Sequence, residues 1–389
     1  MRKTVKVCAS FICLTGVVTY AVAQTRSFPD DPFSQGRFEE AEAAYKAILA
    51  QSPNDAAALA GLARARVFDD QVDQAIELAN KALAVAPDNP MAATILRTAQ
   101  ARKASFGPDR YVTKLDRPVA IKFIQTDPLP SLTVTIGTRQ ATFIIDTGGP
   151  DVVLSARLAQ ELGLPLTDGP MGTFAGGRQA RTQRALIPKM TLGSIEISNV
   201  PSGVLELPGQ QFDGIIGTGL LMHFLSTIDY CSGQLILAPR SDSASFEKQA
   251  QGNGSNIVRM WLMADHFILA RARLNQAPEG IFHIDTGFAG GGLMGTQEAL
   301  DEAGIVLDKT NVQTGMGGGG AVQSVPFFAG ATLGKLTRTN IRGAFSLGGN
   351  QFGIFPFKVK GALSHQFFRN SRLTFDFDAM RMVTQDCGA

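Results

Sequence analysis

The sequence predicts a mainly β protein in which two duplicated β-rich lobes follow a small helical block. Three observations lead to this prediction. An Ala-rich segment has helical periodicity, the composition then changes to short β-branched runs broken by Gly, and those runs repeat later in the chain. With 389 residues the chain exceeds one core of about 100 to 200 residues, so several domains are expected. Hydrophobic residues at 44% against 18% charged residues exclude a mostly disordered chain.

The N-terminus has the pattern of a secretory signal peptide. A basic start is followed by an apolar stretch, and Ala21-Val22-Ala23 reads as a small-x-small cleavage site. We expect residues 1–23 to be removed. An uncleaved anchor is the alternative, but the apolar stretch is short for a span of about 20 residues. Export is therefore expected, to a periplasm rather than to the medium, with no stable membrane span after cleavage.

The segment 33–103 is predicted to fold as helical repeats. It repeats at 34 residues, as the pairs Ala41/Ala75 and Pro53/Pro87 illustrate. The expected helices cover residues 38–50, 55–67, 71–84 and 89–101. The segment resembles the tetratricopeptide repeat, with one and a half to two units where three or more usually stand alone. The block is therefore expected to be stabilised by packing against the following domain or a protein partner.

Residues 118–240 and 256–385 are predicted to be two homologous lobes. Matching residues recur 139 to 147 positions apart, in the pairs Asp146/Asp285, Ser155/Thr296 and Asp229/Asp376. The small drift in this interval is what loop-length changes produce in a duplicated fold. In each lobe a short helix is expected directly after the Ser or Thr of the middle pair, which would cap it.

Each lobe carries Asp-Thr-Gly at the end of an apolar strand, beginning at Asp146 in the first lobe and at Asp285 in the second. One such tripeptide is weak evidence, because turns after strands are often built from these residues. The duplication is much stronger evidence. A turn needs no copy at the matching place, whereas catalysis by paired carboxylates needs one acid from each side.

A Gly-rich hairpin and an apolar segment follow the Asp-Thr-Gly in both lobes. The hairpin glycines are Gly176 and Gly177 in the first lobe and Gly317 and Gly318 in the second. With the tripeptides, these motifs resemble the aspartic peptidases, specifically the retropepsin-like branch with two lobes fused in one chain. The resemblance covers residues 118–385.

This resemblance implies a bilobal acid-protease β-barrel fold and an endopeptidase activity on polypeptide substrates. As in aspartic proteases generally, Asp146 and Asp285 would share one proton and activate a water. The residues expected to support them are Thr147, Gly148, Thr286 and Gly287. The Thr hydroxyls would hydrogen-bond across the pseudo-twofold axis, and the glycines would permit the turn that presents the carboxylates. The hairpin glycines imply two flaps that open over the substrate.

Two positions depart from the family pattern. The residue after Asp-Thr-Gly is usually small, often Ser or Ala, but here it is Gly149 or Phe288. Without a hydroxyl there, we expect a dyad pKa above that of acid-adapted enzymes and a pH optimum nearer neutral. The Phe288 ring would narrow the cleft or signal lost activity. Two alternatives therefore stay open: a catalytically inactive bilobal peptide-binding module, or a scaffold in which the helical repeats bind a partner.

Composition excludes several other classes. Lys and Arg total 36 against 34 Asp and Glu, without a dense basic run, so no nucleic-acid partner is expected. No nucleophile elbow is present. The four His are scattered and only Cys231 and Cys387 follow the signal peptide, so neither a metal nor a cofactor is expected. Whether these cysteines pair is left open. Asp229 and Asp376 are expected to be exposed carboxylates at strand ends.

Overall fold

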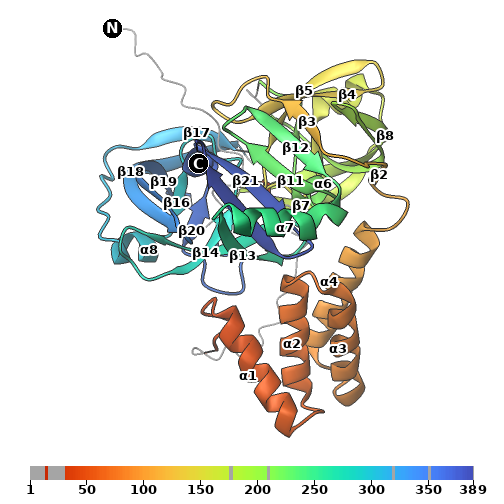
Figure 1. Cartoon of the computed structure of the whole chain (residues 1–389), viewed down its shortest axis with the longest axis vertical. Coiled ribbons are helices and arrows are strands. Elements are labelled where there is room, and N and C mark those ends of the chain that lie inside the picture. The colour runs from red at the N-terminus through yellow and green to blue at the C-terminus, as the bar shows by residue number, and fades with distance from the viewer. Residues whose placement is uncertain are drawn as a thin grey trace.

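The computed structural model describes residues 14–15, 31–174, 178–207, 211–317, 320–348 and 352–388. Most of the expected signal peptide and the hairpin glycines Gly176, Gly177 and Gly318 lie outside these residues. The described chain consists of an N-terminal helical block and two β sheets, which confirms the predicted mainly β fold class. In Figure 1 the helical block lies below the two β lobes.

Four helices form the N-terminal block. They are α1 (Phe38–Gln51), α2 (Ala56–Phe68), α3 (Val72–Val85) and α4 (Pro90–Ser105), close to the predicted ranges. The side chains of Asp55 and Asn89 cap α2 and α4 by accepting a backbone N–H three residues further on. Ala75 and Ala79 are fully buried in the cluster that α3 forms with α2 and α4. None of the described helices is both long and apolar enough to span a membrane.

Nine strands form the first sheet of the described chain, in the order β1-β7-β8-β4-β5-β10-β6-β9-β2. They are β1 (Leu14–Thr15), β2 (Val112–Thr113), β4 (Ser131–Ile136), β5 (Arg139–Ile145), β6 (Val152–Ser155), β7 (Thr167–Phe174), β8 (Arg178–Leu192), β9 (Ile195–Leu205) and β10 (Gly214–Ile216). Two short helices, α5 (Ala156–Glu161) and α6 (Thr218–Leu221), belong to the same part of the chain. Ser155 caps α5 as predicted.

The second sheet has thirteen described strands, in the order β17-β18-β19-β16-β20-β15-β14-β13-β22-β21-β11-β12-β3. They are β3 (Val119–Lys122), β11 (Leu225–Asp229), β12 (Gln234–Ala238), β13 (Asn256–Met263), β14 (Phe267–Leu274), β15 (Gly280–Ile284), β16 (Leu293–Gly295), β17 (Gln313–Gly317), β18 (Gly320–Leu333), β19 (Leu336–Ser346), β20 (Gly361–Leu363), β21 (Ser371–Asp376) and β22 (Arg381–Asp386). The helices among them are α7 (Ser243–Gly252), α8 (Gln297–Glu302) and α9 (His365–Phe368). Thr296 caps α8 as predicted.

Strand pairing repeats from one half of the chain to the other. Strand β5 runs parallel to β10 in the first half, and β15 runs parallel to β20 in the second. In the same way β6 is parallel to β9, and β16 is parallel to β19. The internal repeat in the sequence therefore corresponds to a repeat in topology.

Three strands from the predicted first lobe, β3, β11 and β12, belong to the second sheet. Strand β11 pairs with β21 so that Thr227 lies opposite Thr374, and their hydroxyl oxygens are 2.8 Å apart. These two residues are equivalent in the repeat, being 147 positions apart. The pair therefore marks a local twofold axis, and the sheet joins the two lobes between them (Figure 1).

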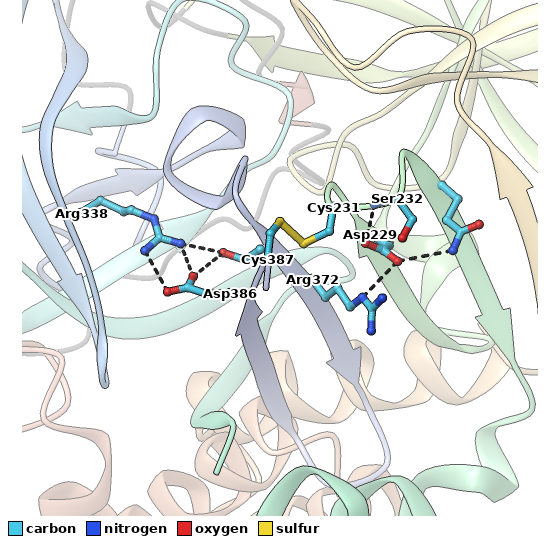
Figure 2. Close-up of a disulfide and its surroundings, with 9 residues drawn as sticks. Asp229, Cys231, Ser232, Arg338, Arg372, Asp386 and Cys387 are labelled. Atoms are coloured by element: carbon cyan, nitrogen blue, oxygen red, sulfur yellow. Dashed lines mark hydrogen bonds and ion pairs between the residues drawn. A yellow bond between two sulfur atoms is a disulfide. The ribbon is translucent and has the colours of Figure 1, made fainter. Parts of the chain in front are cut away.

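Asp229 and Asp376 are buried, so the expectation that they are exposed is wrong. Asp229 accepts from the backbone N–H of Ser232 at 3.0 Å and pairs with Arg372 at 3.1 Å (Figure 2). Asp376 pairs with Arg381 at 2.7 Å. Both carboxylates lie on strands of the sheet that joins the lobes, which removes them from solvent and gives them structural partners.

Cys231 and Cys387 form a disulfide next to this buried Asp229 (Figure 2). Cys231 lies in the turn between β11 and β12, and Cys387 follows β22. The two cysteines are 156 positions apart in the sequence. Their bond connects the end of β22 to the turn between β11 and β12, which belongs to the predicted first lobe.

The helical block packs on the second lobe through aromatic side chains. The Phe38 ring of α1 lies 5.2 Å from the Trp261 ring of β13 and 4.9 Å from the Phe357 ring, measured between centroids. Phe33 and Phe68 belong to the same buried cluster. An ion pair between Glu39 and Arg271 borders it. The block holds two helix pairs and leans on the following domain, as its small number of repeats predicts.

Candidate active site

Two acidic residues emerge from matching strands of the two lobes. Asp146 follows β5 and Asp285 follows β15, and each backbone N–H donates to the neighbouring parallel strand, at Ile216 and Leu363 respectively. We call residues 146–151 the first acid loop and residues 285–292 the second acid loop. Both Asp side chains are fully buried, at 0% exposure.

Gly148 and Gly287 bring the two carboxyl groups together. A Cβ atom at Gly287 would lie 2.1 Å from Cγ of Asp146, and one at Gly148 would lie 2.7 Å from Cγ of Asp285. Each carboxyl group therefore occupies the space that a side chain on the opposite loop would need. Neither glycine has a positive φ. Both glycines lie in the predicted turns after the strands. Because these turns need no positive φ, what requires glycine here is the close approach of the opposite carboxyl group.

Thr147 and Thr286 lock the two acid loops to each other. The Thr147 N–H donates to the Thr286 hydroxyl at 3.1 Å, and the Thr147 hydroxyl donates to the Ile284 carbonyl at 2.8 Å. The second loop repeats the pattern: Thr286 donates its N–H to the Thr147 hydroxyl at 3.0 Å and its hydroxyl to the Ile145 carbonyl at 3.3 Å. These hydrogen bonds are the predicted contact of the two Thr hydroxyls across the pseudo-twofold axis.

The electrostatic environment of the two acids favours one proton shared by the pair. Burial raises the pKa of Asp146 well above its usual value, and the charge and hydrogen bonding of the Asp285 carboxyl raise this pKa further. A backbone N–H opposes these effects, because Gly148 donates to Asp146 Oδ1 at 2.8 Å. The corresponding bond in the other loop runs from Gly287 to Asp285 at 3.0 Å. The pair therefore retains a proton at pH values where an isolated Asp is ionised.

Phe288 packs in a buried cluster of the second lobe. Its side chain is 1% exposed and belongs to a buried cluster with Met294 and Ala344 of the second lobe. The ring lies against Gly290, where a Cβ atom would come within 2.5 Å of it. The Phe288 N–H donates to the Ser364 hydroxyl at 3.1 Å. The glycines of the second acid loop leave room for the ring within the lobe. That the ring narrows the cleft stays a prediction.

Hairpins stand at both expected flap positions. Strands β7 and β8 form one, and β17 and β18 form the other, in which Gly317 pairs with Gly320. Phe174, at the end of β7, is buried in a cluster that includes Ile215 beside the first acid loop and Ala289 of the second. The first hairpin thus packs onto the site. Gly176, Gly177 and Gly318 lie outside the described residues.

Comparisons with known proteins agree with this geometry. Residues 132–220 match the family model for aspartyl proteases. The matched residues include the first acid loop with Asp146 and the strands on either side of it. Residues 33–98 match a tetratricopeptide repeat model, which confirms the predicted repeat type.

Among solved structures, the chain is similar to a retropepsin-like aspartic protease from Rickettsia conorii. The identity is 22%, the match covers 33% of this chain and 96% of that chain, and the TM-score is 0.27. No curated protein matches the chain.

Sequence reasoning missed the side chains that brace the two acid loops. The Tyr111 hydroxyl donates to Asp151 at the end of the first acid loop, and Arg342 donates to the Gly290 carbonyl in the second. Asp151 was accessible to sequence reasoning, since it lies five residues after Asp146. Tyr111 and Arg342 gave no signal, because they are distant in sequence from the loops that they contact. Within the described residues, no group of three or more His, Cys, Asp or Glu could hold a metal ion.

Proposed function

We propose that the protein is an exported aspartic endopeptidase that uses Asp146 and Asp285 as its catalytic dyad. One observation carries this proposal: two acids from duplicated loops meet in one buried site, where each carboxyl group fills the space beside the other loop's glycine. A purely structural turn has no need of a second carboxyl group at this distance, since two buried like charges oppose folding.

The proposed reaction needs one proton on the pair. In the free enzyme Asp146 and Asp285 share this proton, and the protonated carboxyl group donates a hydrogen bond to the substrate carbonyl. The other carboxylate then accepts a proton from a water, which attacks the carbonyl carbon and gives a tetrahedral intermediate without an acyl-enzyme. That carboxyl group then passes the proton it took from the water to the nitrogen of the intermediate, and the C–N bond breaks. The raised pKa also supports an optimum nearer neutral pH than in acid-adapted enzymes.

Substrate entry requires the hairpins to move, because both carboxyl groups are fully buried in the arrangement described here. We assign this opening to the hairpins β7–β8 and β17–β18. In the sequence, the predicted flap glycines Gly176, Gly177, Gly317 and Gly318 lie at or next to the connections between these strands. An open hairpin would admit an extended polypeptide and pair with its backbone. Polypeptides are therefore the proposed substrates.

Two features support export. The first is the signal-peptide pattern of residues 1–23. The second is the disulfide between Cys231 and Cys387, a bond that persists in oxidising compartments such as a periplasm. We assign the helical block a role in contacting a protein partner or positioning substrate, in line with its tetratricopeptide match.

The proposal is tested with residues 24–389 produced under oxidising conditions and offered an unfolded protein across pH 3 to 8. We expect cleavage by the wild type and a loss of about 10²–10⁴-fold or more in kcat for both Asp146→Asn and Asp285→Asn. The control is Asp229→Asn, which removes a buried carboxylate outside the site, with its folding checked by circular dichroism. Cleavage that survives both dyad variants sinks the proposal. Wild-type binding of the substrate without cleavage supports the inactive binding module instead.

A further inference from the structure

The linker between the helical block and the first lobe contacts the first acid loop. Helix α4 ends at Ser105, and Tyr111 follows six residues later with only 4% of its surface exposed. Its hydroxyl donates to Oδ1 of Asp151 at 2.7 Å. A residue outside both lobes' acid loops therefore holds the end of one of them.

Asp151 is also the point where the first acid loop joins the segment after β10. Its carbonyl accepts from the Gly217 N–H at 3.0 Å, while the Gly149 carbonyl accepts from the Thr218 N–H at 2.9 Å. The Thr218 hydroxyl in turn donates to the Thr147 carbonyl at 2.8 Å. These hydrogen bonds restrict the first acid loop, so a displacement of Asp151 also shifts the part of the loop that carries Asp146.

Tyr111 is itself held in an unusual conformation. Its φ is +48°, a value that a non-glycine residue keeps only when its surroundings enforce it. The Tyr111 N–H donates to the Asn199 carbonyl at 3.2 Å, and its ring lies 4.4 Å from the His223 ring. The ring of Phe106, which follows α4 directly, also packs against His223, with 4.7 Å between the ring centroids. These contacts hold the linker in one defined conformation.

Arg102 fixes the end of α4 to the second lobe. It is 4% exposed and donates to the Leu262 carbonyl of β13 at 3.3 Å, as well as to Val67 and Asp70 of the helical block. The turn after β13 carries Asp265, which forms an ion pair with His266. A chain of contacts therefore runs from the docked helical block through the linker to the first acid loop.

We propose that Tyr111 is a positioning residue for peptide hydrolysis, which holds the first acid loop through Asp151 and couples the docking of the helical block to the geometry of the dyad. This inference rests on the proposed function, because it assigns a role within that reaction. Its structural part, the coupling of the linker to the loop, is measurable without any cleavage.

The pair also predicts a pH signature. Burial raises the pKa of Asp151 to about 6, and the Tyr111 hydrogen bond opposes that rise. The other charged groups that face Asp151 are Arg110 on the linker and Asp265 and His266 on the turn after β13. Below about pH 6 the loop loses its charge-assisted bond to Tyr111. We therefore expect kcat to show an inflection near this pH.

The first test compares Tyr111→Phe with Tyr45→Phe, whose hydroxyl accepts a hydrogen bond from Arg64 inside the helical block. For Tyr111→Phe we expect kcat to fall about tenfold with KM within twofold, and the inflection to move to higher pH. Tyr45→Phe keeps the wild-type kcat and inflection. Asp151→Asn keeps an oxygen that accepts the Tyr111 bond but carries no charge and cannot titrate, so we expect the inflection to disappear and kcat at neutral pH to fall to the value that the wild type shows below the inflection. A wild-type kcat and pH profile in Tyr111→Phe overturns the assignment.

The second test measures amide hydrogen exchange in a peptide covering residues 214–221. We expect at least tenfold faster exchange of the Gly217 and Thr218 amides in Tyr111→Phe and in Arg102→Met, and no change in Tyr45→Phe. Unchanged exchange in Tyr111→Phe overturns the inference whether or not the protein cleaves peptides, and unchanged exchange in Arg102→Met overturns the coupling to the helical block. If exchange is faster in both variants but the wild type cleaves no substrate, the coupling is supported and only the proposed function is contradicted.

Discussion

Gly148 and Gly287 set the distance between the two acids of the site. Each of these residues leaves the space that the carboxyl group of the opposite loop fills, so even a methyl group would force the acids apart. The Thr147 and Thr286 hydrogen bonds then hold the loops in this arrangement. The site is therefore specified by steric fit and by hydrogen bonding at once.

Asp146 is expected to lower the stability of the folded protein at neutral pH. The pKa of Asp146 is higher in the folded state than in the unfolded chain, where it is about 3.9. Its contribution to the free energy of unfolding is therefore fully present below the pKa of the unfolded chain and is lost as the pH rises through the pKa of the folded state. Asp146→Asn resembles the protonated form. We expect its gain in Tm over the wild type to be larger at pH 7 than at pH 4, as measured by calorimetry. An equal gain at both pH values would contradict the raised pKa.

The sequence was sufficient to predict the acid pair but not the residues that surround it. Asp146 and Asp285 were found because the same tripeptide occurs at matching places in two repeats. The brace from Tyr111 depends on the path of the linker, which no local pattern encodes. The orientation of Phe288 depends on the space left by neighbouring glycines, so its packing became clear only in three dimensions.

Helix α1 joins the helical block to the second lobe chiefly through one aromatic cluster. Phe38 is 3% exposed and its ring contacts those of Trp261 and Phe357, which belong to the lobe. A block of two helix pairs buries too little surface to be stable alone. Its order should therefore depend on this cluster.

Phe38→Ala is expected to loosen the helical block while the lobes stay folded. Removing a buried ring costs about 3–5 kcal/mol, and most of this loss falls on the contact between α1 and the lobe. Limited proteolysis should then cut within residues 38–51 much faster than in the wild type. Phe328→Ala is the matched control, because that ring is 59% exposed and its loss should leave the cleavage rate unchanged. Equal protection of α1 in both variants would show that the aromatic cluster does not hold the block.

Elements with a local signal were predicted well, and those that depend on distant pairing were not. The four helices followed from a 34-residue period and from apolar residues at helical spacing. The burial of Asp229 and Asp376 did not follow from any pattern. It arises because strands from both halves of the chain join in one sheet, and the hydrophobic alternation of a strand does not reveal its neighbour.

At the scale of the whole molecule, the Cys231–Cys387 bond ties the two halves of the chain. It closes a loop of 156 residues, and cross-links over long loops stabilise by about 2–5 kcal/mol, chiefly by restricting the unfolded chain. We expect the double variant Cys231→Ser and Cys387→Ser to have a lower Tm. Reduction with dithiothreitol should lower the wild-type Tm by the same amount and leave that of the variant unchanged. An identical Tm for oxidised wild type and variant would argue against the bond.

The sheet shared by the lobes gives the chain the internal symmetry of two copies facing each other across the Thr227–Thr374 pair. In a symmetric dimer, two such copies associate in a second-order reaction, and dilution dissociates them. Here both halves belong to one polypeptide, connected through α7, so each meets its partner at a fixed effective concentration. The two-acid site consequently assembles as a first-order step, and its formation is independent of how much protein is present.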